Sequence, residues 1–276
     1  MFVDKKTITR NVTAALTEDV HTGDITAELI AADTQAQATI FAREAMVLCG
    51  CDWADEAIRQ VDPEIIIDWH YEDADHINQQ SIARLAGPAR SLLTVERTLL
   101  NFLQTLSATA TLTRAYVERI QHTHCQILDT RKTIPGLRVA QKYAVHCGGG
   151  TNHRQGLFDA FLIKENHIAA CGSITSAIQQ ARELYPKVLL EVEVEDRLQL
   201  EEALSLSPDR ILLDNFTLPQ LTEAVELTAS RVRLEASGNM TLDTIEAVAE
   251  TGVDFISIGG LTKHVQAVDL SMRFVD

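Results

Sequence analysis

Positive charge is scarce in this sequence of 276 residues, which holds 24 Lys and Arg against 39 Asp and Glu and has a formal net charge of −15. Nucleic acids and anionic membrane surfaces bind basic faces, so neither is expected as a general partner. No run of eighteen apolar residues occurs, and the start, MFVDKKTITRNV, lacks the apolar core of a signal peptide. We therefore expect a soluble, cytoplasmic protein.

Cysteine is also sparse, with five residues, and the number is odd. A disulfide framework is not expected in so long a chain, and reduced thiols are typical of the cytosol. Cys49 and Cys51 form a C-x-C pair without a second pair at zinc-like spacing, so we expect small buried side chains there. With 46% hydrophobic residues, the chain suffices for one large domain or two modest ones.

Up to about residue 90, the sequence predicts a small antiparallel sheet with helices on one face. Short β-rich segments separated by polar turns span 36–44, 45–51, 64–72 and 80–87, and helical spacing fills 51–61. Apolar residues at helical spacing then continue from 91 to 120. This stretch predicts one long helix, or two helices with a break near SATAT, residues 107–111.

From residue 125 onward strands alternate with helices, which predicts a parallel sheet. The predicted strands span 125–130, 160–166, 188–195, 210–215, 232–238 and 254–260. Each of them finishes in polar residues able to do chemistry. In a β/α barrel all carboxyl ends of the strands meet at one mouth, whereas in an open sheet only those near a switch point meet. The polar ends therefore favour an α/β barrel, and six clear strands indicate an incomplete one.

The segment LEVEVE places Glu191, Glu193 and Glu195 in alternation, so a strand here carries all three on one face. Helical stretches flank this strand, which indicates a central strand rather than a solvated edge. Carboxylates facing a barrel interior need cations, either side chains such as Lys164 or a metal. Asp214 follows the next strand along the chain. Carboxylate oxygens without clustered His or Cys suit Mg²⁺ rather than zinc.

Basic residues gather between residues 129 and 168 although the chain as a whole is acidic. Three consecutive glycines, 148–150, interrupt this stretch between a predicted helix and a predicted strand, which excludes the strand-to-helix glycine loop of a dinucleotide fold. The glycines are interpreted either as a helix C-cap and turn or as backbone that lets His153 and Arg154 approach a ligand closely.

Seven segments together resemble the quinolinate phosphoribosyltransferase family, from about residue 14 to the C-terminus: TEDVHTGDIT, ERTLLNFLQTLSATAT, the basic stretch DTRKTIPGLRVAQKYAVHCGGGTNHRQGLFDAFLIKENHI, LEVEVE, ILLDNF, EASGNMT and GVDFISIGGLTKHVQAVDLSM. The resemblance implies an N-terminal α/β sandwich domain, 1–112, completed by the tail 268–276. It also implies an incomplete, six- or seven-stranded α/β barrel, 113–267, and at least a homodimer. Family enzymes convert quinolinate and phosphoribosyl pyrophosphate, with Mg²⁺, to nicotinate mononucleotide, pyrophosphate and CO₂ in NAD biosynthesis.

The resemblance also implies roles for individual residues. Quinolinate would contact Arg97, Arg131, His153, Arg154 and Lys164, with Arg97 reaching the site of the partner subunit. Phosphoribosyl pyrophosphate would contact Lys132, Arg138, Glu193, Asp214, Ser237, Gly238, Gly259, Gly260, Lys263 and His264. Lys132, Lys164, Glu193 and Asp214 would be catalytic, and Glu193 and Asp214 would also serve Mg²⁺. Lys142 is expected to be a solvated helix residue.

The chain departs from the family pattern at two places. Ala108 stands where the family often has glycine, and Lys263 precedes His264 where many members have a single histidine. Three other functions stay open beside the family's own. They are a phosphoribosyltransferase for another pyridine carboxylate, a Schiff-base lyase that uses Lys164, and a non-catalytic binder of aromatic dicarboxylates.

Overall fold

The computed structural model describes residues 3–275. Packing divides them into two units, the first made of residues 3–114, 133–149 and 261–275, and the second of residues 115–132 and 150–260. These units interleave along the chain, whereas the domains expected from the sequence are nearly continuous. None of the described helices is long and apolar enough to cross a membrane. All five cysteines are free thiols, with Cys49 buried and Cys51 half-buried.

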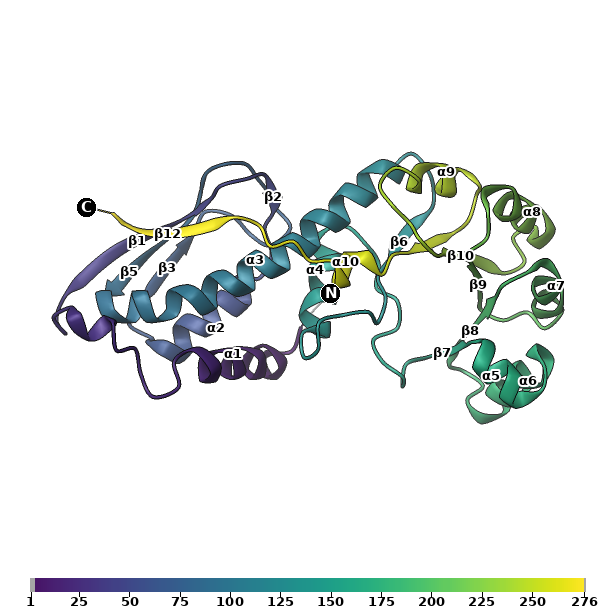
Figure 1. Ribbon diagram of the computed structural model, residues 1–276, viewed down its shortest axis with the longest axis horizontal. Coiled ribbons are helices and arrows are strands. Elements are labelled where there is room, and N and C mark those ends of the chain that lie inside the picture. Colours follow the sequence, from purple (N-terminus) through teal and green to yellow (C-terminus); the bar gives the residue numbers. More distant parts are fainter. Residues whose placement is uncertain (1–2, 276) are drawn as a thin grey trace. The chain divides into compact units, whose positions relative to one another are not determined.

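The first unit is built on a four-stranded antiparallel sheet in the order β12-β1-β5-β3, which confirms the small antiparallel sheet predicted from the sequence. Its helices α2 and α3 lie on one face of that sheet (Figure 1). The elements are α1 (Lys5–Asp19), η1 (Ala27–Leu29), β1 (Gln35–Ala42), β2 (Met46–Val47), α2 (Cys51–Val61), β3 (Ile66–Trp69), β4 (His76–Ile77), β5 (Ser81–Pro88), α3 (Ala89–Ile120), α4 (Arg138–Cys147), α10 (Gly260–Lys263) and β12 (Leu270–Val275). β12 comes from the C-terminal end and pairs with β1.

Helix α3 is continuous over 32 residues, so the alternative of two helices broken near residues 107–111 is wrong. Hydroxyl groups that compete with the backbone are satisfied inside the helix. Thr111 donates to the Ser107 carbonyl at 2.6 Å, and Thr113 donates to the Thr109 carbonyl at 2.8 Å. Bonds of this kind to the preceding turn let Ser and Thr stay in a buried helix.

Helix α4 leads into the three glycines and is buried on most of its surface. Lys142 is fully buried, so the expectation of a solvated side chain is wrong. Its neighbours Gln141 and Ala144 are buried too, which leaves α4 little solvated face. At the end of the helix, a Cβ on Gly148 would lie 2.5 Å from the carbonyl oxygen of Ala110 on α3. The first of the three glycines therefore serves the packing of α4 against α3.

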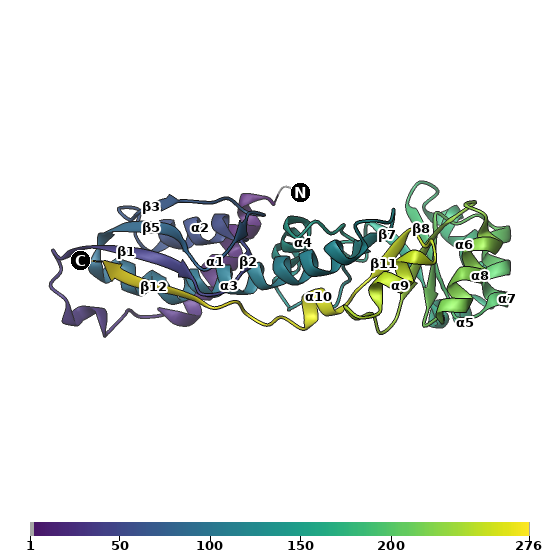
Figure 2. The ribbon, with the colours of Figure 1, turned by 90° about the horizontal axis from the view of Figure 1, so that it is seen from above.

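The second unit holds a six-stranded, wholly parallel sheet in the order β6-β11-β10-β9-β8-β7. Its strands and helices are β6 (Gln126–Leu128), β7 (Ala160–Ile163), α5 (Glu165–Cys171), α6 (Ile174–Leu184), β8 (Leu189–Val194), α7 (Arg197–Ser205), β9 (Arg210–Asp214), α8 (Leu218–Thr228), β10 (Arg233–Ser237), α9 (Ile245–Glu250) and β11 (Phe255–Ser257). Helices α6, α7 and α8 lie side by side along the outer face of this sheet (Figures 1 and 2). No pairing between β6 and β7 closes the sheet among the described residues, which confirms an incomplete barrel.

Register places the polar strand ends next to one another. Glu193 on β8 pairs with Leu212 on β9, and Asp214 at the end of β9 pairs with Ser237 at the end of β10. The carboxyl ends of parallel strands lie at one edge of a sheet, and ligands bind there in α/β folds. The fold therefore directs attention to this edge.

Candidate active site

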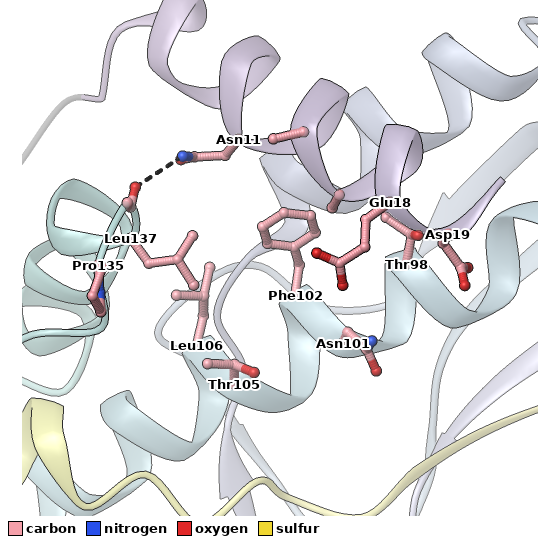
Figure 3. A pocket seen from close by; sticks show the side chains of 13 residues that line it. Asn11, Glu18, Asp19, Thr98, Asn101, Phe102, Thr105, Leu106, Pro135 and Leu137 are labelled. Carbon is pink, nitrogen blue, oxygen red and sulfur yellow. Dashed lines mark hydrogen bonds between the residues drawn. The ribbon is translucent and has the colours of Figure 1, made fainter. Parts of the chain in front are cut away.

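The first unit has a cavity of about 390 Å³ beside α1 and α3 (Figure 3). Asn11 donates to the Gly136 carbonyl at 3.0 Å across one part of it, and Glu18 and Asp19 contribute carboxylates. Among its described lining residues there is no Lys, Arg or His. A cavity with this charge does not favour anionic ligands.

The second unit has a cavity of about 430 Å³ at the carboxyl ends of its strands. Its lining consists of Thr130, Arg131, Lys132, His153, Arg154, Leu162, Lys164, Glu193, Leu212, Asp214, Glu235, Ser237 and Ser257. Eight of the residues singled out from the sequence are therefore brought together: Arg131, Lys132, His153, Arg154, Lys164, Glu193, Asp214 and Ser237. Cationic side chains and carboxylates therefore line the same cavity. A site that binds both a charged ligand and a metal needs both kinds of group.

Two arginines, Arg131 and Arg154, form the guanidinium part of this cavity. Arg131 Nε is buried and makes no hydrogen bond to the described residues. Burial lowers the pKa of the Arg154 guanidinium, and the positive charge of Arg131 lowers it further. A buried N–H group without an acceptor and two neighbouring guanidinium groups both favour a bound anion.

The acidic part of the cavity is formed by Glu193 and Asp214. The Lys164 ammonium contacts the Glu193 carboxylate as an ion pair. Burial nevertheless raises the pKa of Glu193, and the charge of Asp214 raises it further, against the effect of Lys164. Asp214 Oδ2 also accepts from Asn215 Nδ2 at 2.8 Å. Two carboxylates that repel each other at one strand edge form a donor set that suits Mg²⁺.

Two glycines allow close approaches in this unit. A Cβ on Gly259 would lie 2.9 Å from Cδ of Lys132, so glycine leaves room for the lysine chain. Gly238 has φ +109°, and a Cβ there would lie 2.2 Å from Asn215 Oδ1. Neither residue belongs to the cavity lining, and nor does Gly260, so their contacts with phosphate stay a prediction.

Sequence reasoning assigned no individual role to Glu191, one of the three alternating glutamates, or to Glu235, which lines the cavity. Glu191 on β8 and Glu235 on β10 are both fully buried. Burial raises the pKa of Glu235 to about 7, and the negative charge of Glu191 contributes to the increase. Alternation in LEVEVE correctly placed Glu191 and Glu193 on a buried face, but Glu195 lies beyond β8 and is exposed. The signal for Glu235 was a charged residue between Leu234 and Ala236 in the middle of a predicted strand.

Models of known protein families match nearly the whole chain. Residues 24–107 match the family model of the quinolinate phosphoribosyl transferase N-terminal domain, and residues 109–273 match that of its C-terminal domain. The chain belongs to the quinolinate phosphoribosyl transferase family. This confirms the resemblance found in the sequence, and the structure confirms the predicted fold class.

Several family members are close relatives. A probable nicotinate-nucleotide pyrophosphorylase [carboxylating] of Bacillus subtilis is 41% identical over 257 residues, covering 92% of this chain and 89% of its own. The nicotinate-nucleotide pyrophosphorylase [carboxylating] of Mycobacterium leprae is 41% identical over 268 residues, covering 94% of each chain. A solved nicotinate-nucleotide pyrophosphorylase from Francisella tularensis has a TM-score of 0.97 at 48% identity, covering 99% of this chain and 98% of its own.

Four predicted site residues belong to the first unit. Arg97 is exposed on α3, and Lys263 and His264 are exposed at the end of α10 and directly after it. Arg138 begins α4, where its Nε donates to Thr133 Oγ1 at 3.1 Å. The structure does not test their roles toward the substrates, which therefore stay predictions.

Proposed function

We infer that this protein is a pentosyltransferase that transfers a phosphoribosyl group from phosphoribosyl pyrophosphate to quinolinate with decarboxylation. The products are nicotinate mononucleotide, pyrophosphate and CO₂, in the de novo synthesis of NAD. One observation carries the inference: Arg131, Lys132, Arg154 and Lys164 face Glu193 and Asp214 in a single cavity at the strand ends. Family membership supports it, because relatives with this fold have that activity in their names.

The basic side chains suit the charges of quinolinate, a pyridine dicarboxylate. Guanidinium groups bind carboxylates bidentately, so Arg131 and Arg154 take the two carboxylates, with His153 and Lys164 beside them. Leu162 and Leu212 supply the apolar part of the lining against which the pyridine ring packs. Nicotinate has a single carboxylate and would leave part of this basic group without a partner, which disfavours it as a substrate.

The acidic side chains suit the ribose. As pyrophosphate leaves, the ribose carbon becomes oxocarbenium-like, and Glu193 and Asp214 stabilise that positive charge. The pyridine nitrogen attacks the same carbon, and Lys132 neutralises charge on the sugar-phosphate ligand. Decarboxylation needs no further cofactor, because the pyridinium ring accepts the electron pair that the departing carboxylate leaves behind.

Mg²⁺ is the proposed metal, and Glu193 and Asp214 are the residues that would hold it, either directly or through water or substrate. When bound, it would supply positive charge to the pyrophosphate leaving group. Arg138, Ser237, Gly238, Gly259, Gly260, Lys263 and His264 complete the proposed contacts to phosphate. The ion pair of Lys164 with Glu193 argues against the lyase alternative, since a Schiff-base lysine reacts as a neutral amine.

A homodimer completes the proposal. Arg97 and Asn101 are both exposed on α3, while Leu99, Leu100, Leu103 and Leu106 of the same helix are buried. By family resemblance, Arg97 would enter the cavity of the partner subunit. The five free thiols fit the reducing cytoplasm, which is the proposed compartment.

Turnover with purified protein, Mg²⁺ and phosphoribosyl pyrophosphate tests this function. Mononucleotide and CO₂ should form with quinolinate and not with nicotinate. Comparable turnover of both acids would contradict the dicarboxylate assignment of Arg131 and Arg154. Binding of quinolinate without release of pyrophosphate when both substrates are present would identify a binding protein instead.

A further inference from the structure

Arg210, Glu191 and Glu235 form a charged cluster in the second unit, and Glu235 also lines the cavity. Arg210 lies on β9, between the strands of the two glutamates, and is the register partner of Glu191. Arg210 Nη1 lies 2.8 Å from Glu235 Oε2 and 4.0 Å from Glu191 Oε2. The guanidinium also lies over the Phe255 ring, 4.2 Å from its centroid. These contacts fix the guanidinium and, through it, the Glu235 carboxylate.

The imidazole of His153 meets this cluster through one of its two nitrogens. His153 Nε2 lies 2.9 Å from Glu191 Oε2 and 3.5 Å from Glu235 Oε2. Both oxygens of Glu191 and Oε1 of Glu235 are buried and form no hydrogen bond to the described residues. A proton on Nε2 therefore faces two carboxylates that require a donor.

The other imidazole nitrogen contacts the protein backbone. His153 Nδ1 accepts a hydrogen bond from the backbone N–H of Arg154 at 2.6 Å. A nitrogen that accepts carries no proton, so this contact favours the neutral tautomer with its hydrogen on Nε2. The backbone N–H of His153 in turn donates to the buried Asp129 carboxylate at 2.9 Å. The backbone N–H of Arg154 is thus held by the histidine ring, and that of the preceding residue by Asp129.

We propose that His153 is a positioning residue rather than a cationic contact to the substrate. Its neutral imidazole fixes the backbone of Arg154, and Glu191, Glu235 and Arg210 hold the imidazole in the orientation and tautomer that this requires. The inference rests on the proposed function in one respect: Arg154 is the group that meets a substrate carboxylate. A small movement of its backbone would displace the guanidinium, and bidentate binding is sensitive to such displacement.

The tautomer can be read without any substrate. Nitrogen NMR of protein labelled in histidine distinguishes the two neutral tautomers and the imidazolium form, and a His153→Asn variant identifies the signal among nine histidines. We expect the neutral form protonated on Nε2 at neutral pH. A His153 imidazolium under these conditions would overturn the proposal whatever the enzyme turns out to catalyse.

Kinetics tests the positioning. His153→Ala should raise the KM for quinolinate roughly tenfold, since one hydrogen bond contributes about 1.4 kcal/mol, and should affect kcat and the KM for phosphoribosyl pyrophosphate less. Asparagine places an acceptor near the position of Nδ1, so His153→Asn should recover most of the lost affinity. If His153 acted as a cation toward the substrate, the Asn and Ala variants would be equally impaired.

Arg210 provides a second variant with a matched control. Arg233 on β10 also lies over the Phe255 ring, at 5.8 Å from its centroid, but is exposed. Arg210→Met should raise the KM for quinolinate and Arg210→Lys should recover part of the loss, whereas Arg233→Met should leave the KM unchanged. Equal effects of the two methionine variants would contradict the positioning by Arg210. Absence of turnover in the unmodified protein would instead refute the proposed function and leave the NMR result to decide the tautomer.

Discussion

Glu235 allows the electrostatics of the second unit to be tested as a stability effect. Its carboxyl is fully buried, and its pKa is raised from the ordinary 4.5 to about 7. Burial is the main cause, followed by the charge of Glu191, and Arg210 acts in the opposite direction. Since one pKa unit corresponds to about 1.4 kcal/mol, the ionised Glu235 costs the folded state roughly 3 kcal/mol relative to the unfolded chain.

The sign of the pH dependence follows from the raised pKa. The folded state binds the proton of Glu235 more tightly than the unfolded chain, so this group favours folding below about pH 4.5, where both forms are protonated. The advantage is lost as the pH rises toward about 7. Glu235→Gln has no ionisation, so its unfolding free energy relative to the unmodified protein should increase by roughly 3 kcal/mol across this interval.

Urea unfolding followed by circular dichroism at a series of pH values measures this difference. Trp53 and Trp69 both belong to the first unit, so their fluorescence follows that unit separately. Glu226→Gln on the exposed face of α8 is the matched control, and its effect should be small at every pH. A difference between Glu235→Gln and the unmodified protein that stays constant from about pH 5 to about pH 8 would refute the burial argument.

Three further predictions concern the site, the packing and the dimer. Glu193→Gln and Asp214→Asn should each lower kcat roughly a hundredfold while changing the KM for quinolinate less, since both act on the ribose; steady-state kinetics showing lost quinolinate affinity with kcat retained would contradict this. Gly148→Ala should lower the unfolding free energy by about 1–3 kcal/mol in urea denaturation, because its Cβ would lie 2.5 Å from the Ala110 carbonyl oxygen; a variant as stable as the parent would show that α4 can move away from α3. Arg97→Ala and Lys164→Ala should each be inactive, yet random exchange between them should return roughly a quarter of the activity, because about half of the dimers are mixed and each has one intact site; exchange shown by differently tagged chains without recovered activity would mean that Arg97 does not act across the dimer.

The strands were predictable because their signals are local. Alternation and apolar runs located the main strands of both sheets, and the polar strand ends indicated the edge where the cavity lies. Helix α1 also carries a local signal that was overlooked, since Asp4 accepts from the backbone N–H of Thr7 as an N-cap. Residues 107–111 suggested a break in the helix, because hydroxyl side chains are typical of helix ends. The hydrogen bonds of these hydroxyl groups to the preceding turn show how α3 continues.

Features that depend on packing between distant parts of the chain could not be predicted from the sequence. Whether Lys142 is buried depends on what packs against α4, and no periodicity within the helix contains that information. The same holds for His153. The sequence predicted that His153 and Arg154 approach a ligand together. The contact of the His153 imidazole with Glu191 depends on strand order, because these two residues are distant in sequence.

The buried carboxylates Glu191 and Glu235 accompany the basic residues of the cavity. Burial lowers the pKa of Arg154, and the positive charge of Arg131 lowers it further, so the two guanidinium groups repel each other. Glu191 and Glu235 lie near these basic residues. Neither carboxylate accepts a hydrogen bond from Arg131 Nε, which makes no hydrogen bond to the described residues. Their negative charge lowers the repulsion between the guanidinium groups and leaves the Nε–H group of Arg131 to the substrate. Since the charge of Glu191 raises the pKa of Arg154, an apolar residue in place of Glu191 should lower that pKa further.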